Sequence, residues 1–141
     1  MKYLKHFESF AINNNMISGD RVWLIASNAG SEHNDGLQYH EKQIKSKNYY
    51  LLSIPIFKIL EEDPNIKHMI EFEISPYKIN GGEYSFKREI KQPIIIGCVD
   101  NGIGGNYENG VIDGSNRVAQ ATVNGQSEIM AYVPTDSSFV K

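Results

Sequence analysis

Apolar runs separated by glycine-rich turns give the last third of the chain the clearest pattern. Residues 94–99 are continuously apolar, which is typical of a strand buried on both faces. Residues 100–110 are rich in glycine and asparagine and predict a long hairpin connection. The apolar pattern restarts at residues 111–112, so this part of the chain predicts two strands joined as a hairpin.

A short helix and a final strand follow in the pattern. Residues 116–123 contain good helix formers, and Gly125 supplies a residue that adopts the left-handed conformation at helix ends. Residues 128–133 predict a strand, which Pro134 ends. We expect the last seven residues to form a loose tail.

The pattern is weaker in the first two thirds of the chain. Residues 21–27 are rich in β-branched and aromatic side chains and predict a strand. Residues 49–59 predict a longer strand, in which Pro55 favours an edge or bulged position. Residues 37–47 predict a helix with alternating charges and a thin apolar face. Residues 64–72 predict a short helix, because they begin with a proline, which is common in a first helical turn.

Three further segments complete the expected fold. Residues 2–10 place apolar side chains on one helical face, and residues 75–82 contain a proline and a glycine pair that predict a turn. Residues 84–92 predict a helix that stops before the next proline. The whole pattern predicts an N-terminal helix and linker over residues 1–20 and a single α+β domain with a compact mixed sheet over residues 21–141.

Composition limits the classes of function. With 141 residues, of which 40% are hydrophobic and 22% charged, the chain has the size and composition of one globular domain. A net charge of −3 excludes a generally basic protein, so contact with nucleic acid would need a local patch. The one basic cluster, Lys42, Lys45 and Lys47, is more typical of a solvated helix face. Membrane-span and secretory-signal patterns are missing, so we expect a cytoplasmic protein without a membrane partner.

The single cysteine and the histidines do not predict a metal site. One cysteine, Cys98, excludes a disulfide framework and a cysteine-based zinc site, and its position in an apolar run predicts a buried thiol. His33 and His40 lack the spacing of a known metal motif, so we expect both to be exposed to solvent.

Candidate chemistry concentrates where the strand at residues 111–112 turns into the next helix. Gly114 lets the backbone turn sharply and lets an anion approach it closely. The first helical turn has unpaired N–H donors, Ser115 and Asn116 add side-chain donors, and Arg117 adds a cation suited to phosphate. Asp113 could cap the helix, or contact a ribose hydroxyl or a metal ion. The alternative is an ordinary Asp-Gly turn with a capping serine and an exposed Arg117.

The order of these elements resembles the core of the ParB/sulfiredoxin superfamily. Residues 90–134 read as a Q-P-I strand, a variable hairpin, a strand, D-G-x-x-R-x-x-A, a short helix, a glycine and a strand ending in V-P. An upstream apolar strand extends the likeness over residues 53–134. In that family the turn equivalent to Gly114–Arg117 binds the phosphates of a nucleotide. The resemblance therefore implies ATP, CTP or ADP as the ligand, with Mg²⁺.

Departures from the subfamilies narrow the expectation. Sulfiredoxins have G-C-H-R at the turn, where this chain has Ser115 and Asn116, so the resemblance argues against peroxiredoxin repair. Chromosome-partition ParB proteins have G-E-R-R there and continue into further domains, for which we expect no room. A D-G-H-H-R group that includes a free-serine kinase is closer. Its catalytic members use an acidic residue just after the first core strand, a place held here by Glu61 and Glu62.

We therefore expect a nucleotide-binding protein that acts as an ATPase or phosphotransferase. Asp113, Gly114, Ser115, Asn116 and Arg117 would bind the nucleotide, with Asp113 as the metal contact. A glutamate just after the first core strand would act as general base or metal ligand. Two alternatives stay open: a non-catalytic regulatory module with a nucleotide, DNA or protein partner, and a ParB-like DNase, against which the acidic charge argues.

Overall fold

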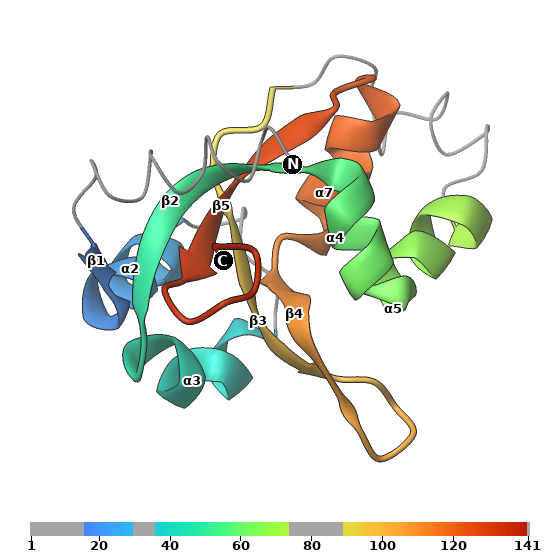
Figure 1. The fold of residues 1–141 in the computed structure, drawn as a ribbon. Coiled ribbons are helices and arrows are strands. Elements are labelled where there is room, and N and C mark those ends of the chain that lie inside the picture. The colour runs from blue at the N-terminus through green and yellow to red at the C-terminus, as the bar shows by residue number, and fades with distance from the viewer. Residues whose placement is uncertain (1–15, 30–35, 74–88, 141) are drawn as a thin grey trace.

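The computed structural model describes residues 16–29, 36–73 and 89–140. Its centre is a mixed five-stranded sheet with the order β1-β2-β5-β3-β4, and helices lie on both faces (Figure 1). The strands are β1 (Ile17–Ser18), β2 (Asn48–Pro55), β3 (Ile94–Asp100), β4 (Asn106–Asp113) and β5 (Glu128–Pro134). The predicted α+β class is confirmed.

The helices are short. They are α2 (Gly19–Ser27), the 3-10 helix η2 (Leu37–His40), α3 (Glu41–Lys45), α4 (Ile56–Glu62), α5 (Pro64–His68), the π-helical turn η3 (Met69–Glu73) and α7 (Ser115–Val123). None of the helices in the described ranges is long and apolar enough to span a membrane.

Each face of the sheet has its own hydrophobic core. Apolar residues of α4, α5 and α7 pack on one face, where β5 contributes Ile129, Ala131 and Val133. Residues of α2, η2 and α3 pack on the other face, where β5 contributes Tyr132. The alternation along β5 follows from the two-residue period of a strand, which sends neighbouring side chains to opposite faces.

The predictions for the last third of the chain are largely confirmed. β3 and β4 form an antiparallel hairpin, α7 follows β4, and β5 pairs parallel to β3 and antiparallel to β2. Gly125 ends α7 with φ +74°. The hairpin connection is shorter than predicted, because β4 already begins at Asn106.

The predicted strand at residues 21–27 is wrong, because these residues belong to α2. Ser18 accepts a hydrogen bond from the amide of Arg21 and so caps the helix. Val22 and Ala26, four residues apart, are both buried, which is the spacing of one helical face. Composition favours a strand here, but capping and burial at helical spacing determine the structure.

The predicted strand at residues 49–59 is confirmed only as far as Pro55, and α4 begins at the next residue. Ile56 and Ile59 then point to the core from one helical face. The predicted helix after Pro64 is confirmed as α5, with Asp63 as its cap. Residues 89–92 of the predicted helix 84–92 are not helical; the rest of that segment, and the predictions for residues 2–10 and 75–82, lie outside the described residues.

The predicted loose tail is also wrong. Phe139 is 5% exposed and belongs to the core beneath α4 and α7. The hydroxyl of Ser137 donates to the side-chain oxygen of Asn109 at 2.6 Å, and the Asn109 amide donates to the hydroxyl of Ser138 at 2.7 Å. These contacts fasten residues 135–140 to β4.

Cys98 is exposed, contrary to the predicted burial. β3 is buried from Ile94 to Gly97, and its pairing with β4 is then irregular between Gly97 and Val99. The side-chain amide of Gln43 on α3 bonds to both the N–H and the C=O of Cys98. The irregular pairing brings the cysteine to the surface, so burial of the strand does not extend to its thiol.

Asp63 connects the helices of one face to the edge of the sheet. Its carboxylate is 1% exposed and accepts hydrogen bonds from the amide of Ile66 at 3.3 Å and from the amide of Val111 at 2.9 Å. Val111 lies on β4, an outer strand of the sheet. The carboxylate therefore takes the place of a neighbouring strand at this point of the edge.

We predict that Asp63→Ala strongly destabilises the protein. The substitution leaves the buried amide of Val111 without an acceptor, which costs roughly 1–3 kcal/mol. It also removes the side-chain cap of α5, although the amide of Ile66 keeps its 3.1 Å bond to the backbone C=O of residue 63. Urea denaturation measures the change in the free energy of unfolding. Asp136→Ala is the matched control, since it removes an exposed ion pair with Lys47, and such pairs contribute about 0–1 kcal/mol. Equal losses in the two variants would contradict the role of Asp63.

Candidate functional site

The turn between β4 and α7 is tightly packed around Gly114. Gly114 has φ +108°, a left-handed conformation that side chains disfavour. A Cβ at this position would lie 2.6 Å from Cγ2 of Ile94 and 2.9 Å from Nε of Arg117. Position 114 therefore admits only glycine. The sequence pattern predicts a glycine here, because the backbone turns sharply and other groups approach it closely.

Arg117 and Asp113 form a buried ion pair across this turn. Nη2 of Arg117 lies 2.9 Å from Oδ2 of Asp113, and the two residues are 7% and 2% exposed. The exposed Arg117 of the alternative, an ordinary Asp-Gly turn, is wrong, because its guanidinium folds back over Gly114. Nε of Arg117 is buried and has no hydrogen-bond partner among the described residues.

The start of α7 offers backbone donors beside this guanidinium. The amides of Arg117 and Val118 donate to the C=O of Gly114 at 2.9 Å and 3.0 Å, so they belong to the helix. The amide of Ser115 precedes these bonds, at the positive end of the helix dipole. Ser115 is half-buried and Asn116 is exposed. The structure thus brings together the five residues that the sequence singled out, from Asp113 to Arg117.

His40 is a neighbour of this turn that the sequence did not indicate. η2 packs against β4, and burial there lowers the pKa of His40 below its ordinary value of 6.5. The negative charge of Asp113 raises the same pKa, but by less than burial lowers it. The expected full exposure of His40 is wrong, since it is half-buried, and His33 lies outside the described ranges. His40 and Asp113 are 73 positions apart in the sequence, which hides this proximity from sequence reasoning.

Glu61 and Glu62 lie at the end of α4. The side chain of Glu61 is 64% exposed and its carboxylate lies 3.8 Å from Nζ of Lys58, while Glu62 is half-buried. α4 and α7 pack on the same face of the sheet. Within the described ranges, no hydrogen bond or ion pair connects either glutamate to the turn at residues 113–117.

Metal ligands do not gather at the turn. Oδ2 of Asp113 is engaged by Arg117. Within the part of the chain that the structure describes, no group of three or more His, Cys, Asp or Glu side chains could hold a metal ion. The geometry therefore favours Asp113 as the partner of Arg117 over Asp113 as a metal ligand.

Comparison of the chain with known protein families, with curated proteins and with solved structures finds no match. The resemblance to the ParB/sulfiredoxin superfamily accordingly remains a hypothesis based on sequence.

We predict that Arg117→Ala and Asp113→Ala each lower the free energy of unfolding by roughly 3–5 kcal/mol, because each removes one partner of a buried ion pair. The double variant should lose less than the sum of the two, which urea denaturation of all four proteins measures as a coupling energy. Additive losses would show that the pair is not coupled in solution.

We predict that acidification destabilises the protein through His40. A pKa below 6.5 in the folded state means that the unfolded chain binds the proton more tightly. The contribution of His40 is complete above pH 6.5 and is lost as the pH falls from 6.5 through the folded pKa. An NMR titration of the imidazole measures that pKa. His40→Gln should flatten the dependence of unfolding free energy on pH in this window, and an unchanged dependence would contradict the assignment.

Proposed function

We propose that the β4–α7 turn binds the phosphate groups of a nucleotide, which the protein hydrolyses or uses for phosphoryl transfer. The observation that carries this proposal is the guanidinium of Arg117. It is buried, lies against Gly114 and keeps one N–H without an acceptor. Such a donor costs free energy in a native structure. An oxygen of a phosphate group in the turn would supply the missing acceptor.

The backbone of the turn supports the same ligand. Gly114 has no side chain to keep an anion away, and the amide of Ser115 belongs to the first residue of α7, at the positive end of the helix dipole. The charge of Arg117 is balanced by Asp113 as long as the ion pair is closed. Phosphate binding would therefore exchange part of the contact with Asp113 for contacts with phosphate oxygens.

The proposed chemistry depends on positioning more than on covalent groups. Phosphoryl transfer is accelerated mainly by holding the phosphates in line and by neutralising their charge, for which Mg²⁺ is usually bound through the phosphates and one or two carboxylates. ATP, ADP and CTP are the candidate ligands. Asp113 does not fit as the metal ligand while it pairs with Arg117. The metal therefore enters no step of the proposal.

A non-catalytic nucleotide-binding module is the second candidate. The position of Glu61 favours it, because this carboxylate is largely in solvent and close to Lys58, whereas a general base needs hydrogen-bond reach of the reacting group. Glu61→Gln and Glu62→Gln separate the candidates. Loss of nucleotide turnover with unchanged affinity supports the enzyme, and a wild-type protein that binds without turnover supports the module.

We predict that Ser115→Asp abolishes nucleotide binding without destabilising the fold. The new carboxylate would repel phosphate, while a negative charge in the first turn of a helix is favourable by about 0.3–1 kcal/mol. Calorimetric titration with ATP, ADP, CTP and inorganic triphosphate measures affinity, and thermal melting measures stability.

Ser127→Asp is the matched control, because it adds the same charge at an exposed position beyond the far end of α7. It should bind nucleotides as the wild type does. Wild-type affinity in Ser115→Asp, or no binding of any of these ligands to the wild type, would overturn the proposal.

A further inference from the structure

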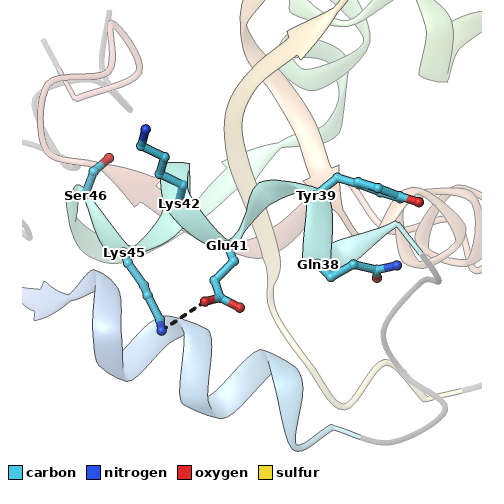
Figure 2. Close-up of a pocket in the computed structure, with 6 residues that line it drawn as sticks. All are labelled: Gln38, Tyr39, Glu41, Lys42, Lys45 and Ser46. Atoms are coloured by element: carbon cyan, nitrogen blue, oxygen red, sulfur yellow. Dashed lines mark hydrogen bonds and ion pairs between the residues drawn. The ribbon is translucent and has the colours of Figure 1, made fainter.

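The outward face of η2 and α3 forms a groove on the opposite side of these helices from the core. The inward residues Leu37 and Ile44 are buried. The groove is shallow and largely open to solvent, with a volume of about 640 Å³. Figure 2 shows the six residues that line it: Gln38, Tyr39, Glu41, Lys42, Lys45 and Ser46.

Tyr39 presents an aromatic ring to solvent at one end of this groove. The residue is 82% exposed, and Figure 2 shows its side chain extending away from the helix. Its neighbour Leu37 already supplies the apolar anchor of η2 to the core. The fold therefore does not require the ring, which leaves a π-face open for stacking.

The groove is locally basic on an acidic protein. It carries two lysines against one glutamate, although the chain has a net charge of −3. Lys45 lies 3.1 Å from the Glu41 carboxylate and 5.9 Å from the centre of the Trp23 ring. Lys42 is exposed and forms no ion pair within the described ranges. Lys42 is thus the cation available to an anionic ligand, whereas the charge of Lys45 is partly neutralised by Glu41.

We propose that this groove binds single-stranded nucleic acid. Tyr39 stacks on a base, Lys42 contacts the phosphate backbone one helical turn away, and Gln38 supplies an amide for base edges. An exposed aromatic beside a lysine favours a nucleic acid over an acidic peptide, because a carboxylate-rich peptide gains nothing from a stacking surface. The groove is independent of the β4–α7 turn, so this inference does not rest on the proposed nucleotide function.

The test is fluorescence anisotropy of the full chain with labelled oligo(dT) and oligo(U) at low and moderate salt. Tyr39→Ala should weaken binding about tenfold or more, as expected for the loss of one stacked base. Lys42→Gln should weaken it and reduce the slope of log affinity against log salt by about 0.7, the value for one phosphate contact on a single strand.

Glu41→Gln provides a gain-of-binding arm. It releases Lys45 from its ion pair, so the affinity for the oligonucleotides should increase, and log affinity should fall more steeply with log salt. Lys67→Gln is the matched control: Lys67 is exposed on α5, which packs on the other face of the sheet, and its loss should leave binding unchanged.

Three outcomes would overturn the inference: no binding of either oligonucleotide at low salt, equal affinity of wild type and Tyr39→Ala, or polyglutamate binding as tightly as the oligonucleotides. Circular dichroism and melting confirm that the variants fold. Two controls distinguish this inference from the proposed nucleotide function. Tyr39→Ala should still bind ATP at the β4–α7 turn, and Ser115→Asp should still bind the oligonucleotides in the groove.

Discussion

The carboxylate of Asp63 holds the corner between α4 and α5 against the open edge of the sheet. Its bond to the amide of Val111 requires Gly110, because a Cβ there would lie 3.1 Å from Oδ2 of Asp63 and 2.6 Å from Cγ2 of Val99. An edge strand otherwise presents unpaired backbone groups to solvent or to other chains. The contact fixes β4 two residues before its end, and the position of the turn at Gly114 depends on it.

The ion pair at that turn determines the orientation of the Arg117 guanidinium more than it contributes to the stability of the fold. Desolvation of two buried charges offsets most of their attraction, so the pair of Asp113 and Arg117 adds little net stability compared with an apolar pair. What the pair fixes is the guanidinium, which lies across Gly114 with its Nε unsatisfied. A well-packed apolar pair would leave no donor at this place. The arrangement is therefore consistent with a preorganised contact for an anion. The stability of the rest of the fold offsets the free-energy cost of the unsatisfied Nε.

Local patterns predict the hairpin and α7 well, because glycines and apolar runs determine those elements within a few residues. α2 was missed because Val22, Trp23 and Ile25 count as strand formers by composition, whereas the cap at Ser18 decides for a helix. The packed tail was missed because Phe139 is anchored through Asn109, some thirty residues earlier. The same difference applies to the candidate site. Its turn is contiguous in sequence and could be predicted, whereas only the fold brings His40 close to Asp113.

The two candidate sites differ in how strongly function is tied to folding. Asp113, Gly114 and Arg117 are buried, so a change in Arg117 or Gly114 disturbs packing together with any ligand contact. The groove consists mostly of exposed groups on η2 and α3, whose core anchors, Leu37 and Ile44, lie on the other side. Substitutions in the groove therefore leave both core anchors in place. η2 belongs to both surroundings, because it places Tyr39 in the groove and brings His40 to Asp113. The sheet edge fixed by Asp63 therefore positions the turn directly, whereas the groove is positioned by the packing of η2 on β4, by the packing of α3 on α2 and by the bonds of Gln43 to Cys98 on β3.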